Sequence, residues 1–82
     1  MTLDKHTIQG VPKISVRTLP AADFEQLIMG AGYTRIGSAP VKGNRVKVWW
    51  SHPIFPRVEV IYSPDMQVVI TAYHVSGQNP NP

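Results

Sequence analysis

A glutamate, an arginine and a histidine occur in one stretch, residues 57–75, whose pattern predicts a β-hairpin. The stretch alternates apolar and polar residues on both sides of a Pro-Asp pair at 64–65, which is typical of a tight turn. Glu59, Arg57 and His74 supply a carboxylate, a guanidinium and an imidazole. Metal-free cleavage of an RNA phosphodiester needs such groups as general base, phosphate clamp and general acid. The alternative interpretation is an exposed Arg57–Glu59 ion pair, with a histidine that caps a strand end.

The turn fixes which residues we expect to share a face of the hairpin. A tight turn at 64–65 pairs Tyr62 with Gln67, and side chains then alternate between two faces. The more apolar face collects Val58, Val60, Tyr62, Val69, Thr71 and Tyr73. The other face collects Arg57, Glu59, Ile61, Val68, Ile70, Ala72 and His74. We expect the first face to pack under a helix, which leaves the second face open.

Other side chains are further candidates for the site. Thr71 and Tyr73 favour strands and are expected to pack in the core, but they become the site if the two faces are exchanged. His6 lies beside Lys5 in an irregular N-terminal segment, and His52 is a second candidate acid near a strand end. Three scattered histidines without any cysteine match no metal-ligand spacing, so we expect neither a metal nor another cofactor.

Basic and aromatic side chains form a second group. Lys42, Arg45, Lys47 and Arg57 fall within sixteen positions that contain no acidic residue. Such a patch attracts phosphates, although a solvated basic surface has the same composition. Trp49 and Trp50 are adjacent, so they face opposite sides of a strand and one lies outside the helix-covered core. An exposed Trp49 beside Lys47 can stack a base, and it can equally anchor a protein interface.

Length and composition predict a single small domain. The chain has 82 residues, a net charge of +3 and no cysteine, which excludes disulfides. Residues 1–10 do not resemble a signal peptide, and no apolar run approaches the roughly 20 residues of a membrane helix. We therefore expect a soluble protein made in the cytoplasm, without membrane contact. Residues 1–75 are expected to form the domain and 76–82 a flexible tail.

The order of the expected elements predicts an α+β fold. Residues 13–18, 33–37 and 45–51 have the pattern of strands, and 21–29 have the three-and-four spacing of an amphipathic helix. Loops are expected at 38–44 and, because two prolines restrict it, at 52–56. With the hairpin, these elements predict one N-terminal helix packed on a three- to four-stranded antiparallel sheet. One helix covers only one face of such a sheet.

Residues 57–75 (Arg-Val-Glu-Val-Ile-Tyr-Ser-Pro-Asp-Met-Gln-Val-Val-Ile-Thr-Ala-Tyr-His-Val) resemble the terminal hairpin of small bacterial toxin ribonucleases. These are the barnase, colicin and RelE-like proteins and the C-terminal toxin domains of contact-dependent inhibition proteins. The resemblance implies a sheet packed on an N-terminal helix, with active residues on the open face. It points to Thr71 and Tyr73, and to His6 or Lys13 in the N-terminal segment. The chain departs from that group in having one convincing helix and a proline-rich loop.

A second resemblance involves the helix and its exit. Residues 24–35 (Phe-Glu-Gln-Leu-Ile-Met-Gly-Ala-Gly-Tyr-Thr-Arg) look like the first helix of HicA-like toxins, which have a fold similar to double-stranded-RNA-binding domains. The next strand of those toxins opens with Gly-Ser-His, whereas this chain has Gly43-Asn44-Arg45. The histidine that the resemblance would assign to catalysis is therefore absent here.

Two hypotheses about function follow. The first is a metal-independent toxin ribonuclease, a hydrolase that cleaves tRNA or mRNA and has a cognate inhibitor protein of the immunity or antitoxin type. It would act in the cytoplasm, and in that of a target cell if the chain is a delivered toxin fragment. The second is a binding protein without enzymatic activity, such as an immunity protein, antitoxin or phage inhibitor, that uses the open face and an exposed tryptophan.

Overall fold

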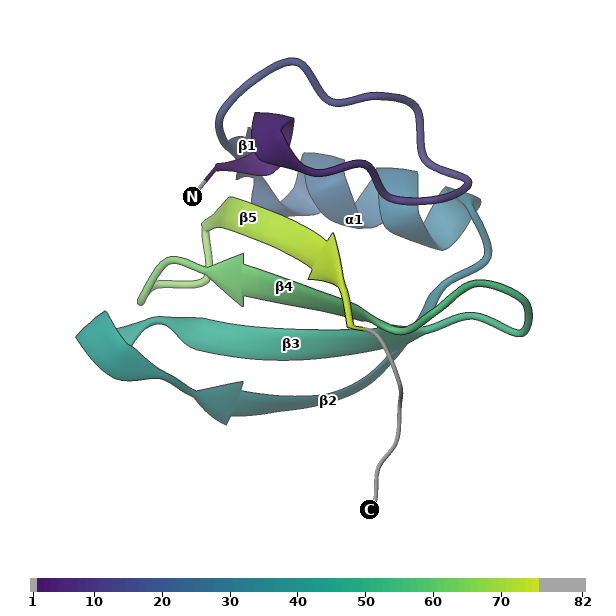
Figure 1. The fold of residues 1–82 in the computed structure, drawn as a ribbon. Coiled ribbons are helices and arrows are strands. Elements are labelled where there is room, and N and C mark those ends of the chain that lie inside the picture. Colours follow the sequence, from purple (N-terminus) through teal and green to yellow (C-terminus); the bar gives the residue numbers. More distant parts are fainter. Residues whose placement is uncertain (1, 76–82) are drawn as a thin grey trace.

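The computed structural model describes residues 2–75 and shows one helix packed on a five-stranded antiparallel sheet (Figure 1). The sheet order is β1-β5-β4-β3-β2. The strands are β1 (Leu19–Pro20), β2 (Thr34–Pro40), β3 (Val46–Ser51), β4 (Val58–Tyr62) and β5 (Val68–His74). The helix α1 is Ala21–Gly30, and short 3₁₀ turns occupy Leu3–Lys5 (η1) and Lys42–Asn44 (η2).

The predicted α+β class with one helix is confirmed, and the number of strands is higher than expected. The sheet has five strands instead of three or four, and α1 follows residues 2–20, which include η1 and β1. Within residues 2–75, no helix has the length and apolar character that crossing a membrane requires. The expected tail at 76–82 lies outside the described residues.

The expected strand at 13–18 is wrong. Those residues form no strand, and β1 is a two-residue strand that pairs with Val69 and Val68 of β5. The N-terminal segment lies beside the rest of β5 instead, where the Thr71 hydroxyl donates to the Thr2 carbonyl. The Leu3 amide in turn donates to the carbonyl of Arg17, so residues 13–18 are held by the N-terminal segment. The expected loop at 38–44 is also shorter, because β2 continues to Pro40.

The hydrophobic core lies between α1 and one face of the sheet. Phe24 and Ile28 of α1 are fully buried, as are Val48, Val58 and Val60 of the sheet. The N-terminal segment adds a further set of buried apolar residues: Leu3, Ile8, Val11 and Ile14. These four apolar side chains complete the core, because the ten-residue helix α1 is too short to cover the whole face of the sheet.

The turn between β4 and β5 is longer than the sequence suggests. The Met66 amide donates to the Ser63 carbonyl, while Asp65 accepts the Ser63 hydroxyl and the Gln67 amide. Met66 adopts a positive φ of 62°. The Ser63 amide donates to the Val68 carbonyl at 2.8 Å, so Tyr62 faces Val69 and not Gln67. This shift by two residues leaves the faces of β5 unchanged.

A β-bulge then exchanges the faces of the second half of β5. Tyr62 faces Val69, but its neighbour Ile61 faces Thr71. Ile70 is therefore an extra residue without a pairing partner in β4. A shift by one residue turns every following side chain to the other face. The predicted grouping of His74 with Glu59 is therefore wrong.

The observed pairs show the exchange directly. His74 faces Val58 and Ala72 faces Val60, on the side covered by α1. Tyr73 faces Glu59 and Thr71 faces Ile61, on the opposite side. The expected burial of Val60 and Val69 is confirmed, since both are fully buried.

The register of the hairpin can be tested by cross-linking, because the chain has no native cysteine. We expect the double variant Ile61→Cys with Thr71→Cys to form an intramolecular disulfide under mild oxidation, since directly opposite residues bring their Cβ atoms within bonding reach. The matched pair Ile61→Cys with Val68→Cys, which the tight-turn register would place opposite, should stay reduced. Cross-linking of the second pair alone, read by mass spectrometry, would contradict the bulge.

Val60→Ala should lower the free energy of unfolding by about 1–4 kcal/mol, because it opens a cavity under α1. Lys13→Ala is the control on an exposed position and should change stability by less than about 0.5 kcal/mol. Urea unfolding of the three proteins checks this. Equal midpoints for both variants would show that Val60 does not support the core.

Candidate active site

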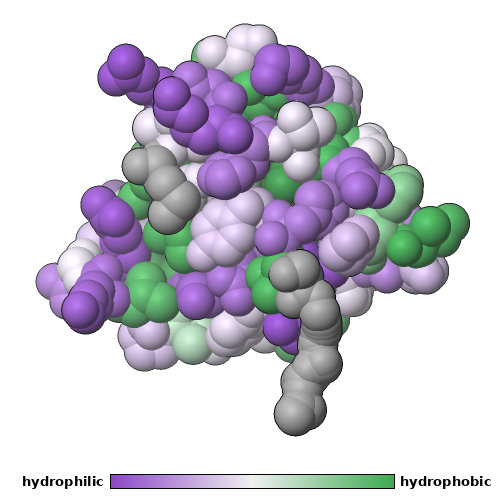
Figure 2. Space-filling view, in the orientation of Figure 1, coloured by the Kyte–Doolittle hydropathy of each residue, from purple (hydrophilic) through white to green (hydrophobic). Residues whose placement is uncertain are grey.

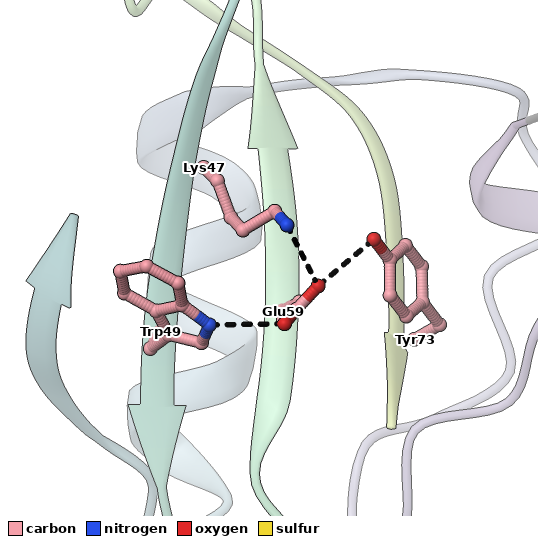
Figure 3. Close-up of polar contacts among 4 residues, drawn as sticks. All are labelled: Lys47, Trp49, Glu59 and Tyr73. Atoms are coloured by element: carbon pink, nitrogen blue, oxygen red, sulfur yellow. Dashed lines mark hydrogen bonds and ion pairs between the residues drawn. The ribbon is translucent and has the colours of Figure 1, made fainter. Parts of the chain in front are cut away.

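The face of the sheet away from α1 carries the candidate site. We call it the open face and define it by the side chains of Lys47, Trp49, Glu59, Ile61 and Tyr73, which share a side according to the strand register. All five are partly exposed. Figure 3 looks onto this face, with α1 behind the strands. It contains members of both candidate groups from the sequence.

Glu59 is the centre of a polar cluster that joins three neighbouring strands (Figure 3). The Trp49 indole Nε1 donates to Glu59 Oε2 at 3.0 Å, and the Tyr73 hydroxyl donates to Oε1 at 3.0 Å. Lys47 Nζ lies 3.3 Å from the same Oε1. Within residues 2–75 this is the only ion pair. Both carboxylate oxygens are therefore held, with two donors on one oxygen and one on the other.

The cluster sets the protonation of its members. Burial of Glu59 by itself raises its pKa, but the hydrogen bonds from Trp49 and Tyr73 and the charge of Lys47 outweigh burial and bring the pKa below its ordinary value. Burial, together with the bond to the Glu59 carboxylate, raises the pKa of Tyr73. At neutral pH Glu59 is therefore a carboxylate and Tyr73 a protonated phenol.

Strand β3 positions two of these side chains by simple alternation. Lys47 and Trp49 point to the open face, while Val48 and Trp50 are buried under α1. The predicted division of the two tryptophans is therefore confirmed, with Trp50 in the core. Gly37 of β2 lies opposite Trp49, and a Cβ added there would be 3.7 Å from the indole Cε3. The indole thus lies beside a strand position that has no side chain.

The N-terminal segment brings a histidine to the cluster. The His6 ring lies 5.7 Å from the Tyr73 ring between centroids, tilted by 58°. Its Nε2 is buried and has no hydrogen-bond partner among the described residues. Thr71 is also buried, and its hydroxyl donates a hydrogen bond to the Thr2 carbonyl at 3.3 Å. Of these two candidates, His6 has an unused polar atom and Thr71 does not.

The structure places His74 on the other face of the sheet from Glu59. Its Nε2 accepts the Gln9 amide at 3.0 Å, and its Nδ1 lies 3.0 Å from the Pro56 carbonyl. A ring with its hydrogen on Nδ1 satisfies both contacts. Because both nitrogens bind backbone, His74 acts as a brace between the N-terminal segment and the loop at 52–56. The prediction that His74 shares a face with Glu59, on which its assignment as general acid depended, is therefore wrong.

Arg57 and His52 also lie apart from the cluster. Arg57 is exposed, precedes β4 and forms no ion pair with Glu59, so the alternative interpretation of an exposed Arg57–Glu59 ion pair is wrong. His52 Nδ1 accepts the amides of Ile54 and Phe55, and its Nε2 lies 3.0 Å from the Ala31 carbonyl. His52 therefore organises the loop that carries it and has no free nitrogen for acid catalysis.

The basic residues divide between the cluster and the η2 turn. Lys42 and Arg45 are exposed on the turn that joins β2 to β3. Lys47 follows this turn along β3, so the three cations occupy the same end of the hairpin. Among the described residues, no group of three or more His, Asp or Glu side chains lies close enough together to hold a metal ion.

Comparisons of the chain with protein-family models, curated proteins and solved structures find no match. The candidate site is therefore defined by its geometry: Lys47, Trp49, Glu59, Tyr73 and His6. Sequence reasoning named all five but could not group them, because the bulge at Ile70 has no marker in the local pattern. It did not single out Gly37, whose only signal is a glycine inside a predicted strand.

The tyrosines give a direct test of the cluster. All three in the chain have raised pKa values: burial raises that of Tyr33, burial and Glu25 raise that of Tyr62, and burial and Glu59 raise that of Tyr73. In the folded protein, we expect no tyrosine to ionise at the ordinary value of about 10. Since unfolding restores that value, the free energy of unfolding should fall as the pH rises above it.

Ultraviolet absorbance of tyrosinate during an alkaline titration measures this. In Glu59→Gln, one of the three transitions should move back toward the ordinary value, because the negative charge beside Tyr73 is gone. Glu25→Gln is the matched control, which should move the Tyr62 transition and leave that of Tyr73 in place. A Glu59→Gln titration identical to that of the unchanged protein would contradict the contact.

Proposed function

We propose that the protein is a metal-independent endoribonuclease whose reaction takes place at the Glu59 cluster. The observation that carries the proposal is one carboxylate held by a cation, a phenol and an indole on the open face, with the imidazole of His6 beside the phenol. The set contains a base, an acid and a phosphate-binding cation, which suffice for this chemistry. The resemblance of residues 57–75 to toxin ribonuclease hairpins supports the same class of reaction.

In the proposed reaction Glu59 accepts the proton of a ribose 2′-hydroxyl, and the 2′-oxygen attacks the adjacent phosphorus. The bond from phosphorus to the 5′-oxygen breaks, and the His6 imidazolium gives that oxygen a proton. The products are a 2′,3′-cyclic phosphate and a free 5′-hydroxyl. Lys47 stabilises the negative charge that builds up on the phosphate oxygens, and the Tyr73 hydroxyl orients them.

The free site holds Glu59 in an ionised but weakly basic form. Lys47 and Tyr73 both bind Oε1, and these are the two groups that a substrate phosphate would attract. Transfer of both donors to the phosphate frees Oε1 and removes two of the causes that lower the pKa of Glu59. Trp49 keeps Oε2 fixed meanwhile. Substrate binding would thus raise the basicity of a carboxylate that stays oriented.

The scattered apolar side chains on the surface favour a polyanion, and not another protein, as the main partner. Large exposed hydrophobic residues lie on separate elements: Val16, Met29, Ile36 and Ile54. The side seen in Figure 2 is mostly hydrophilic, with apolar side chains in small separate groups. Protein interfaces are more often marked by one contiguous apolar patch. As a toxin, the protein would also have an inhibitor that offers carboxylates to the same cations.

Cleavage of total RNA in the presence of EDTA tests the proposal. We expect products that end in 2′,3′-cyclic phosphate, and a rate reduced about 10²–10⁴-fold in Glu59→Gln and in His6→Ala, because each removes a proton-transfer group. Tyr62→Phe is the control: it removes the hydroxyl of the other Tyr–Glu pair, which lies on the covered face, and should keep the rate.

Circular dichroism shows whether each variant is folded. Intact RNA after incubation with folded protein at micromolar concentration would overturn the proposal. So would a Glu59→Gln variant that retains full activity. In the first case, a tight protein partner recovered by affinity capture would favour the binding-protein hypothesis.

A further inference from the structure

Trp49 has a place on the open face that its hydrogen bond alone does not explain. The indole lies across β3, with its Nε1 directed to Glu59 of β4 and its other ring beside Gly37 of β2 (Figure 3). On this face Gly37 and Ala39 of β2 lie opposite Trp49 and Lys47. The ring is therefore partly exposed, beside two positions of β2 that carry no side chain larger than a methyl group.

Apart from the Glu59 carboxylate that the indole contacts, the charged residues of the segment that carries this ring are all positive. The chain has no Asp or Glu between Glu25 and Glu59, whereas it has five cations there: Arg35, Lys42, Arg45, Lys47 and Arg57. Lys47 Nζ lies 6.0 Å from the Trp49 ring centroid, and Lys42 and Arg45 are exposed on the turn at the same end of β3. Positive charge thus lies at the η2 turn and, through Lys47, beside the carboxylate.

We propose that the open face takes single-stranded RNA, with one base stacked on Trp49 and the phosphate backbone running past Lys47 toward Lys42 and Arg45. This inference rests on the proposed function for the position of the reacting phosphate at Glu59. An unpaired base can leave its neighbours and lie on an aromatic side chain of a sheet, whereas a base in a duplex is stacked on both sides. A nucleotide free to rotate can also align its 2′-oxygen with the phosphate for attack.

Binding of an oligonucleotide that cannot be cleaved separates this inference from the reaction. A short fluorescein-labelled 2′-O-methyl RNA, which lacks the attacking hydroxyl, is titrated as a single strand and as a duplex with its complement, and anisotropy is measured. We expect the single strand to bind more tightly and to quench tryptophan fluorescence. Trp50 is buried, so the quenching reports on Trp49.

Two substitutions of the same residue distinguish stacking from positioning. Trp49→Ala should weaken single-strand binding about 5- to 100-fold, since it removes the stacking surface. Trp49→Phe keeps a ring but loses the donor to Glu59. It should bind nearly as well as the unchanged protein and cleave RNA more slowly. Lys42→Gln with Arg45→Gln should weaken binding and reduce its dependence on salt.

Each result has a definite meaning. Equal affinity for single strand and duplex, or unchanged binding by a folded Trp49→Ala, would overturn the inference even if the protein cleaves RNA. Selective single-strand binding that depends on Trp49 supports it. If that binding is found and 2′-hydroxyl RNA stays intact, the proposed ribonuclease function fails while the surface for single strands stands.

Discussion

The extra residue Ile70 in β5 decides which side chains meet on each face of the sheet. A strand alternates with a period of two, so one inserted residue moves Thr71 to His74 to the opposite sides from those that a regular hairpin would give. Without the bulge, Tyr73 would lie under α1 and His74 would share a face with Glu59. With it, the phenol meets the carboxylate on the open face, and the imidazole becomes a brace between backbone segments.

The contacts of the Glu59 carboxylate also stabilise the sheet. A partly buried charge is costly unless its oxygens are satisfied, and here three donors from β3 and β5 satisfy them. The contacts tie three strands together on the face that α1 does not cover. In the proposed reaction, Lys47 and Tyr73 bind the substrate phosphate in place of Glu59 Oε1, so no further side chain is needed.

The two Tyr–Glu pairs of the protein lie in different surroundings. Tyr62 is fully buried and donates to Glu25 of α1 at 2.6 Å, which fastens the helix to the sheet. Tyr73 donates to Glu59 at 3.0 Å on a partly exposed surface beside His6 and Lys47. The first pair is inaccessible to a substrate. The second is within reach of one, and the N-terminal segment supplies an imidazole only there.

The sequence by itself determined the elements with strong local patterns. The helix predicted at 21–29 and observed at 21–30, the placement of Trp49 and Trp50 on opposite faces, and the burial of Val60 and Val69 all follow from periodicity, because period and burial are coupled along a single element. The candidate residues of the site were likewise named by their chemistry.

The register of β5 and the role of the N-terminal segment were decided only by the tertiary structure. The bulge arises where Ile61 pairs with Thr71 while Tyr62 pairs with Val69, and the turn chemistry at 64–65 does not encode such an offset. Leu3 and Ile8 become core residues because α1 covers only part of the sheet, which is a property of the assembled fold. Side chains distant in sequence, such as His6 and Tyr73, meet because pairing and packing place them together, and no local period records those contacts.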